Sequence, residues 1–252
     1  MINVWAADNG RPVFLEAPMP TLRLDKIIAD TGLFSRSEAA SLIKHGRVTV
    51  DDRIVCSGAE KFDTEARRFA IDGQQLDYRK KRYIMLNKPK GYVSSTEDKR
   101  DVTVMQLLDE RYSRLGLFPV GRLDKDAEGL LLLTNDGDFA HEITSPGKKV
   151  DKTYFVQFDG EVSKNDIEAF SRGITLGDGT KCMPAILEPK SDGAFVTINE
   201  GKYHQVKRMF AAINKPVRNL RRISTGGLIL DERLKPGEYR ELSHEDIFLL
   251  FK

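Results

Sequence analysis

The chain has 252 residues, of which 40% are hydrophobic and 31% are charged, so we expect it to bury a core in one or two domains. Its formal net charge is only +2, so the total charge does not indicate a partner, and local clusters of charge have to be considered instead. The first residues lack the basic and apolar regions of a secretory signal, and no apolar run reaches the ~20 residues of a membrane span. The two cysteines and four histidines show no zinc-ligand spacing. We therefore expect a cytoplasmic protein that is not bound to a membrane and holds no metal.

The N-terminal part of the chain divides into two stretches. Residues 1–20 show no sustained hydrophobic period, and we interpret them as an N-terminal extension. In residues 21–78, apolar side chains first recur at helical spacing, and Ser35 with Glu38 then has the spacing of a capping box that opens a second helix. An alternating stretch at 47–50 predicts a strand. This stretch therefore predicts a small αα-then-β domain.

The basic side chains of this small domain are candidates for contact with RNA phosphates. Basic residues on a helix are more often a solvated face, so the spacing alone leaves both interpretations open. The candidates are Arg23, Lys26, Arg36, Lys44 and Arg47.

A second domain is predicted over residues 79–252, after a charged linker at 76–82. Helices are expected to begin at Thr103, Ser163 and Ser243. Because strands and helices do not alternate strictly, a doubly wound parallel sheet is disfavoured, and we expect an α+β fold with a central, mainly antiparallel mixed sheet flanked by helices. Strands are predicted at 83–86, 117–120, 130–134, 153–158 and 194–198.

A charged turn between two apolar strands is the first candidate for chemistry. Residues 121–129 read GRLDKDAEG and place Arg122 and Asp124 in this turn. Strand ends hold loops rigidly, so sites are often built there. An arginine two residues before an aspartate can pair with it and keep it ionised. The same pattern also fits a surface hairpin with ion pairs, and by itself it does not decide between the two.

Two basic blocks favour nucleic acid as a partner. Residues 205–222 and residues 79–90 each hold six basic side chains and no acidic one, which suits a phosphate backbone better than a merely solubilising face. No phosphate loop, dinucleotide fingerprint or serine-hydrolase elbow is present in the sequence. The RNA-binding candidates in and beside these blocks are Lys88, Lys90, Lys202, His204, Gln205 and Arg208.

Taken together, several segments resemble one family, the RsuA-like pseudouridine synthases. Residues 121–124 (GRLD), continuing into GLLLLTNDG, resemble its catalytic motif, and residues 85–93 resemble its first motif. Residues 152–154 (KTY) resemble the motif that holds the family's active-site tyrosine, and residues 200–209 resemble its last core motif. Residues 22–50 resemble the small RNA-binding domain that these enzymes share with a small-subunit ribosomal protein.

The resemblance implies that the chain isomerises a specific uridine in RNA to pseudouridine, without a cofactor or a metal. A carboxylate can serve there as a nucleophile or stabilise positive charge at the sugar, and an aromatic ring can stack on a base that has left its helix. Ala127 departs from the family, which commonly carries a hydroxyl residue at this position. Carried over by motif position, Asp124 is the essential carboxylate, Arg122 arranges the site or displaced RNA bases, Tyr154 stacks on the target uracil, Lys207 pairs with Asp124, and Val206 lines the base pocket.

The expected substrate is 16S ribosomal RNA, free or in an assembling small-subunit particle, because residues 200–210 look most like members that act on it. We expect a monomer. The alternatives are a synthase for 23S ribosomal RNA or transfer RNA and a non-catalytic RNA-binding protein. A nucleoside glycosidase would need a second acid to activate water, such as Asp126 or Glu128, and would leave the basic blocks without a use.

Overall fold

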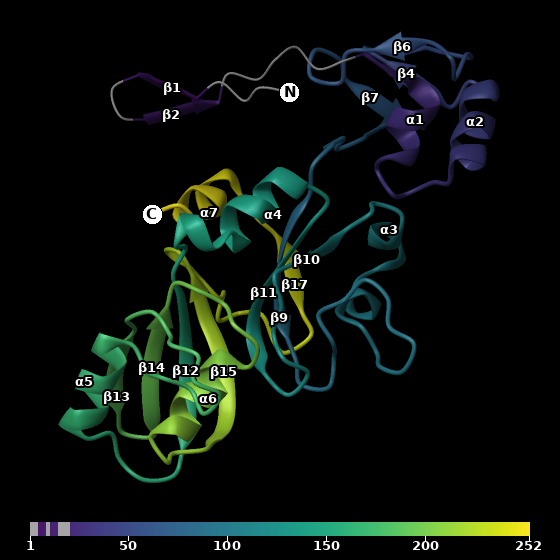
Figure 1. Cartoon of the computed structure of the whole chain (residues 1–252). Coiled ribbons are helices and arrows are strands. Elements are labelled where there is room, and N and C mark those ends of the chain that lie inside the picture. Colours follow the sequence, from purple (N-terminus) through teal and green to yellow (C-terminus); the bar gives the residue numbers. More distant parts are fainter. Residues whose placement is uncertain (1–4, 9–10, 15–20) are drawn as a thin grey trace. The chain divides into compact units, whose positions relative to one another are not determined.

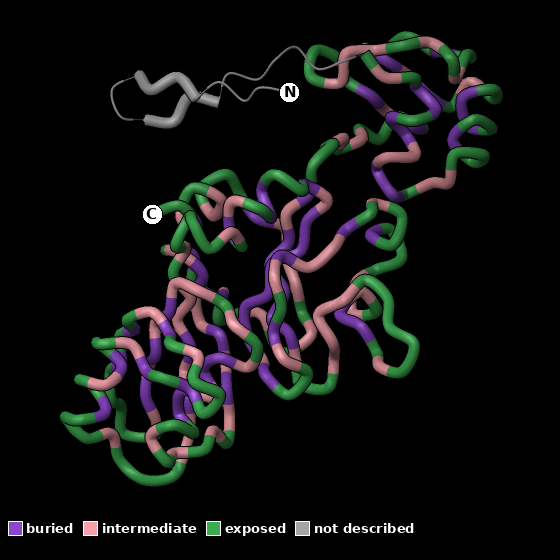
Figure 2. Tube along the Cα trace, viewed as in Figure 1, coloured by how far each residue is buried: buried purple, intermediate pink, exposed green. Residues whose placement is uncertain are grey.

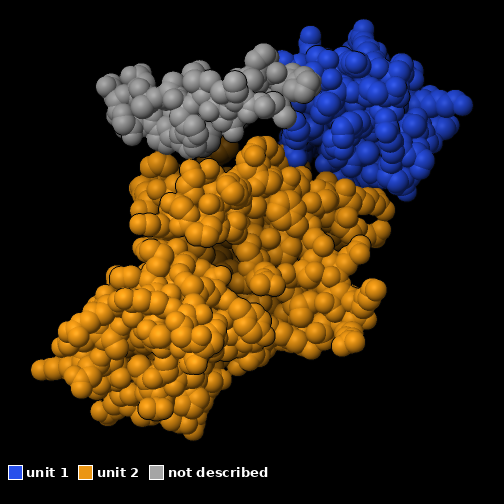
Figure 3. Space-filling view, viewed as in Figure 1, with its two compact units in different colours: residues 1–80 blue, residues 81–252 orange. Residues whose placement is uncertain are grey.

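The computed structural model describes the backbone of residues 5–8, 11–14 and 21–252 and the side chains of residues 21–252. The chain separates into two compact units, residues 1–80 and residues 81–252 (Figure 3). The predicted N-terminal extension lies mostly outside the described residues, and its described parts are two antiparallel strands, β1 (Trp5–Asp8) and β2 (Arg11–Phe14). In the described part of the chain, no helix is both long enough and apolar enough to cross a membrane.

From its first helix onward, unit 1 has the αα-then-β order that the sequence predicts, and the short strand β3 (Leu22–Arg23), which the sequence did not predict, precedes the helices (Figure 1). Its helices α1 (Leu24–Ala29) and α2 (Arg36–Lys44) bury apolar faces in one core with the strands. The predicted capping box opens α2: the side chain of Ser35 accepts from the amide of Glu38, and the Glu38 carboxylate accepts from the amide of Ser35. The strands are β3 (Leu22–Arg23), which pairs with β6 (Lys61–Phe62), and the antiparallel set β5 (Arg53–Ile54), β4 (Val48–Val50), β7 (Phe69–Ile71) and β8 (Gln74–Gln75).

Unit 2 is built on a nine-stranded mixed sheet. Its order is β13-β14-β12-β15-β11-β9-β17, with β10 paired to β11 and β16 paired to β15. Only β11 and β15 run parallel, so the expected α+β fold with a mainly antiparallel sheet is confirmed. The strands are β9 (Tyr83–Lys88), β10 (Phe118–Val120), β11 (Glu128–Thr134), β12 (Lys152–Phe158), β13 (Ile186–Lys190), β14 (Gly193–Ile198), β15 (Val217–Thr225), β16 (Leu228–Ile229) and β17 (Tyr239–Glu241).

The helices of unit 2 follow the predicted starts, with one correction. Ser163 opens α5 (Lys164–Arg172), and Ser243 opens α7 (His244–Leu249). At Thr103 the predicted capping box is present, but it opens only a 3-10 turn (Val104–Leu107), because the backbone at Leu108 is extended. The remaining helices are α3 (Glu110–Ser113), α4 (Gly137–Thr144) and α6 (Gln205–Ala212).

Both faces of the sheet are covered, which explains the uninterrupted apolar run of β11. Leu131 and Leu133 belong to the core on the side of α5 and α6, whereas Leu130 and Leu132 belong to the core on the side of α4. Figure 2 shows buried residues running along the central strands. A strand that is buried on both faces is a rigid support for the loop that precedes it.

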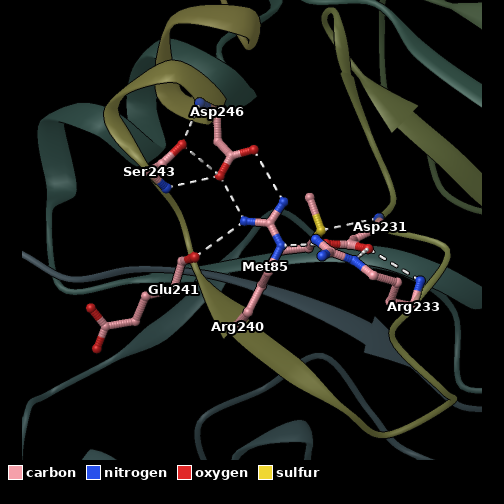
Figure 4. A network of polar contacts seen from close by, with 7 residues as sticks. All are labelled: Met85, Asp231, Arg233, Arg240, Glu241, Ser243 and Asp246. Carbon is pink, nitrogen blue, oxygen red and sulfur yellow. Dashed lines mark hydrogen bonds and ion pairs between the residues drawn. The ribbon is translucent and has the colours of Figure 1, made fainter.

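Helix α7 is tied to the sheet by a polar network centred on Arg240 (Figure 4). Its guanidinium lies 2.8 Å from the carboxylate of Asp231 and 2.6 Å from that of Asp246. Asp246 also accepts hydrogen bonds from the amide and the hydroxyl of Ser243, so the same carboxylate caps the helix and anchors it.

Candidate active site

The charged turn of residues 121–127 lies where β11 begins. At this end of β11, Gly129 is paired with Lys88 on β9 and with Arg222 on β15. Gly129 has a φ of +104°, and a Cβ atom there would lie 2.2 Å from the carbonyl oxygen of Arg222. Only glycine fits such a close backbone approach at positive φ. The turn therefore lies at the junction of three strands, β9, β11 and β15, which are far apart in the sequence.

Lys88 holds the turn through hydrogen bonds from its side chain to backbone carbonyl oxygens. Its side chain is fully buried, and its ammonium donates hydrogen bonds to the carbonyl oxygens of Ala127 (2.8 Å), Asp124 (3.0 Å) and Pro89 (3.0 Å). The carbonyl of Lys125 lies 3.5 Å away. Burial lowers the pKa of Lys88 to about 8, against the attraction of nearby carboxylates. A buried cation that gathers these carbonyls fixes the backbone of the turn.

Lys88 is one of the predicted RNA-binding residues, but its side chain is buried beneath the turn and its ammonium is engaged with carbonyl oxygens. The loop after β9 holds the turn as well. Ser94 exchanges two hydrogen bonds with the backbone of Leu123, at 2.9 and 3.0 Å, and the amide of Gly91 donates to Lys125. Residues in and next to the first motif (residues 85–93) thus hold the charged turn in place through hydrogen bonds to its backbone.

The carboxylate of Asp124 meets the start of α6. Its Oδ2 atom lies 2.9 Å from the ammonium of Lys207, and its Oδ1 atom lies 3.5 Å from Nε2 of His204. Lys207 also donates to Asp126 at 2.5 Å. Burial opposes the charge of Lys207, but its hydrogen bonds to Asp126 and Asp124 prevail and raise its pKa. The same hydrogen bond from Lys207 lowers the pKa of Asp126.

The cation beside Asp124 is thus Lys207, as the resemblance implies, and not Arg122, whose spacing in the sequence would also have allowed this pair. Arg122 is exposed, and its side chain forms no ion pair or hydrogen bond with the described residues. Its donors remain open to solvent, where a large polar substrate could meet them.

The loop before α6 is locked by a buried amide. Gln205 donates to Glu200 at 2.7 Å and accepts from the amide of Lys202 at 2.9 Å. The ammonium of Lys202 forms an ion pair with Glu200. Gln205 is one of the predicted RNA-binding residues, but its side chain is buried and both ends of its amide form hydrogen bonds inside the protein. The residue instead helps to hold His204 in its left-handed conformation (φ 46°) at the start of α6.

Tyr154 and Val206 lie in the core on the α6 side of the sheet. Tyr154 stands on β12, directly opposite Arg222 on β15, and only 8% of it is exposed. The carbon at the centre of the Arg222 guanidinium lies 6.0 Å from the centre of the tyrosine ring. The sequence indicated Tyr154 through its motif but did not single out Arg222, because nothing in the basic block marks which arginine is buried.

An exposed aromatic ring also lies beside the carboxylate. Tyr203 is 69% exposed, and its ring stacks on that of His204 with 3.8 Å between the ring centres. The sequence shows an aromatic residue here but not this stacking, because His204 reaches the position through its left-handed backbone.

The remaining basic candidates lie at or near the surface of each unit. Several of them form ion pairs, and Lys44 and Lys90 are exposed. The pairs are Arg23 with Asp25 (2.7 Å), Lys26 with Asp30 (2.9 Å), Arg36 with Asp25 (3.7 Å), Arg47 with Asp72, and Arg208 with Asp178 (2.5 Å).

Comparisons with known proteins show the family to which the chain belongs. The RNA pseudouridylate synthase family matches residues 82–212, and the S4 domain family matches residues 22–73. The chain is 46% identical to the ribosomal small subunit pseudouridine synthase A of Escherichia coli strain K12, over 90% of this chain and 98% of that one. It is 44% identical to the protein of that name from Vibrio cholerae, over 92% of this chain and 100% of that one.

A crystal structure of a pseudouridylate synthase superposes with a TM-score of 0.64 at 41% identity, covering 91% of this chain and 99% of the other. An uncharacterized RNA pseudouridine synthase of Bacillus subtilis is 44% identical over 91% of this chain and 98% of its own length. The family matches cover residues 22–73 and 82–212, and the alignments with these relatives cover 90–92% of the chain. The chain therefore belongs to the RsuA-like pseudouridine synthases and is an RNA pseudouridine synthase.

Proposed function

We propose that this enzyme converts one uridine of 16S ribosomal RNA to pseudouridine, with Asp124 as the catalytic carboxylate. The observation that carries the assignment of Asp124 is its position: it stands in a turn fixed by Lys88, at the end of a doubly buried strand, with Lys207 as a counter-ion. The similarity to small-subunit enzymes of two bacteria supports the choice of 16S RNA. Such a substrate also places the enzyme in the cytoplasm.

The reaction is an isomerisation, so it needs no other reactant. The N1–C1′ bond of the uridine breaks, the base turns, and C5 bonds to C1′. C5 then loses its proton and N1 takes one up. The carboxylate of Asp124 attacks either C1′ of the sugar or C6 of the base, and its negative charge is matched by Lys207. Placing a fixed cation beside the nucleophile before the substrate arrives avoids reorganisation during the reaction.

The other residues of the site bind the nucleotide. Tyr154 is proposed to stack on the target uracil, and Val206 to line the pocket on the α6 side of the sheet. The exposed guanidinium of Arg122 is proposed to hold the RNA bases that are displaced when the uridine leaves the helix. The enzyme is proposed to act as a monomer, since one chain carries all of these groups.

We propose that residues 21–78 form an RNA-binding domain and residues 79–252 the catalytic domain. The match of the S4 domain family to residues 22–73 supports the first assignment. The surface cations that would meet phosphates are Arg23, Lys26, Arg36, Lys44, Arg47, Lys90, Lys202, His204 (when protonated) and Arg208.

The test is release of tritium from C5-labelled uridine in 16S ribosomal RNA. The wild type should release label, whereas Asp124→Asn should release none and still bind the RNA. Asp126→Asn is the matched control, because Asp126 contacts the same ammonium from the same turn but is 74% exposed. Asp126→Asn should keep most of the activity. If it lost activity as completely as Asp124→Asn, two acids would be needed, as in a glycosidase.

The substrate is tested in parallel with 23S ribosomal RNA, transfer RNA and partly assembled small-subunit particles. Release from 23S or transfer RNA but not from 16S RNA would contradict the proposed target and leave the catalytic assignment intact. Retained activity of Asp124→Asn would contradict the catalytic assignment itself.

A further inference from the structure

Arg222 is a buried cation with unused donors. Only 4% of it is exposed, and its Nε donates to the carbonyl oxygen of Leu130 at 2.7 Å. Among the described residues, no carboxylate lies within ion-pair distance of it, and its two terminal nitrogens have no hydrogen-bond partner. A guanidinium carries five donors, and buried ones are normally paired because desolvating a charge is costly. The guanidinium lies over the ring of Tyr154, but this contact uses none of the hydrogen-bond donors of its terminal nitrogens. Donors left open at this depth point to a ligand.

The position of Arg222 indicates the kind of ligand that it would bind. It stands on β15, directly opposite Tyr154 on one side and Gly129 on the other. Its guanidinium is 6.0 Å from the ring of Tyr154. Burial has the largest effect on the pKa of Lys88, and the carboxylates of Asp126 and Asp124 act against it; the charge of Arg222 then lowers this pKa further. Lys88 is the residue whose ammonium holds the carbonyl of Asp124. Arg222 thus lies between the proposed stacking platform of the target base and the turn that carries the carboxylate.

The terminal nitrogens of Arg222 are not among the fully buried, unpartnered side-chain atoms of the described residues, so they keep some exposure to solvent. A base stacked on Tyr154 would present carbonyl oxygens at its edge, and these are natural acceptors for a guanidinium. Arg222 makes this contact from a rigid strand in the middle of the sheet, so its position is set before the substrate binds.

We propose that Arg222 binds the uracil of the target nucleotide and stabilises the negative charge that the base acquires during the reaction. The proposal rests on the proposed catalytic site. It adds a residue that contacts the substrate and stabilises charge on the base, whichever atom Asp124 attacks.

The chemistry requires such a charge on either route. If Asp124 attacks C1′, an ester bond forms, the N1–C1′ bond breaks, and its electron pair leaves on the uracil as an anion shared by N1, O2 and O4. If Asp124 attacks C6, the electron pair of the C5–C6 bond moves to O4 as an enolate. On this second route the N1–C1′ bond then breaks, N1 takes up a proton and C1′ is left as a cation. When C5 bonds to C1′, the charge on the base disappears on either route. On the first route this bond displaces the carboxylate from C1′, and on the second the carboxylate leaves C6 afterwards, as C5 loses its proton and the C5–C6 double bond re-forms. A fixed guanidinium in a poorly hydrated site favours the charged stage over the neutral ones before and after it.

The test is a single-turnover assay with C5-tritiated 16S ribosomal RNA, together with a separate measurement of RNA affinity. Arg222→Gln should slow the chemical step by about 10²–10³-fold while the dissociation constant of the RNA changes much less. Arg222→Lys keeps the charge and should recover part of the rate. Arg221→Gln is the matched control, because Arg221 is the next residue of the same strand and points to the other face. It should react at the wild-type rate.

A merely structural role for Arg222, through its hydrogen bond to Leu130, is separated by a second substrate. Fluorine at C5 withdraws electrons and stabilises the anionic base by itself. Consumption of 5-fluorouridine in the RNA, followed in nucleoside digests, should therefore be slowed at least tenfold less by Arg222→Gln than the reaction of uridine. An equal slowing of both substrates would overturn the proposal, as would a wild-type rate for Arg222→Gln with uridine.

Two controls keep the outcome decisive. Thermal unfolding of each variant shows whether it is folded, and if Arg222→Gln is not, Arg222→Lys is compared with the wild type on both substrates instead. If the wild type itself modifies another RNA, that RNA replaces the 16S substrate, and the failure of the proposed target is recorded separately from that of Arg222.

Discussion

The ammonium of Lys207 lies between two carboxylates of one turn, 2.9 Å from Asp124 and 2.5 Å from Asp126. The lysine comes from helix α6 and the aspartates from the turn before β11. The contact is one of several links between these two segments, which are far apart in sequence. Lys207 therefore links the helix to the turn, and the proposed function gives it a second role as the counter-ion of Asp124.

Replacing Lys207 by methionine should lower the rate of the chemical step by about 10²-fold, since a preorganised charge beside the reacting group is removed. Lys207→Arg should retain more of the rate because it keeps the charge. The rate is measured in single-turnover assays with saturating enzyme. Equal rates for Lys207→Met and the wild type would show that the ion pair does not contribute to turnover.

The raised pKa of Lys207 sets its pH dependence. A lysine whose pKa is raised on folding contributes stability below its ordinary pKa of about 10.4, and this contribution is lost only as the pH rises through the higher folded value. The difference in free energy of unfolding between the wild type and Lys207→Met should therefore stay constant from pH 7 to about 10. Chemical denaturation at several pH values checks this, and a difference that shrinks by pH 8 would contradict it.

Lys88→Met should destabilise unit 2 by about 2–4 kcal/mol, because carbonyl oxygens buried beneath the turn lose their donor. Activity should fall as well, since the backbone of Asp124 is then no longer held. Urea denaturation and single-turnover rates test the two effects. Lys90→Met is the matched control, because Lys90 lies two residues away and is exposed, and it should leave the stability unchanged.

The pKa of Lys88, lowered to about 8 by burial, gives a separate signature. The folded protein gives up this proton more readily than the unfolded chain, so protonated Lys88 costs stability below about pH 8. That cost is relieved as the pH rises from about 8 toward the unfolded value of about 10.4. The free energy of unfolding of the wild type should therefore rise relative to that of Lys88→Met over this pH range. A constant difference between the two would show that Lys88 does not titrate there.

Charge removal on unit 1 tests the proposed RNA-binding surface. Changing Arg36, Lys44 and Arg47 together to glutamine should weaken RNA binding and reduce the slope of log K against log salt by about 2–3, if each contacts one phosphate. Arg53, Arg67 and Arg68 provide the control, because they are exposed on the same unit and their replacement removes the same charge. The same loss of slope in both triple variants would indicate a general electrostatic effect instead of a defined surface.

The network around Arg240 predicts a loss of stability that depends on acid. Hydrogen bonds from Arg240 lower the pKa of Asp246, and those from Arg233 and Arg240 lower that of Asp231. Such carboxylates contribute stability above their unfolded pKa of about 3.9, and lose it as the pH falls through the folded value. Arg240→Gln should lower the melting temperature by about 2–4 °C at pH 7, and by less at pH 3. An equal decrease at both pH values would count against the network.

Local signals in the sequence were sufficient for the elements and for the turn that carries Asp124. Capping boxes at Ser35 and Ser163 mark where helices begin because they involve only neighbouring residues. The apolar run that became β11 predicted a strand, and the charged residues before it predicted a turn at the strand's end. The motifs also indicated Tyr154 and Lys207, since their order along the chain is that of a known family.

Tertiary structure decided which of these residues meet and which are hidden. Lys88 and Gln205 looked like surface groups within polar stretches, and only the pairing of β9 with β11 and the packing of the loop before α6 buried them. Arg222 is one of six basic residues in its block. The antiparallel pairing of β15 with β12 places it beside Tyr154, and the parallel pairing of β15 with β11 places it beside Gly129. A side chain's burial depends on contacts between segments far apart in sequence, and hydrophobic periodicity within one segment does not contain them.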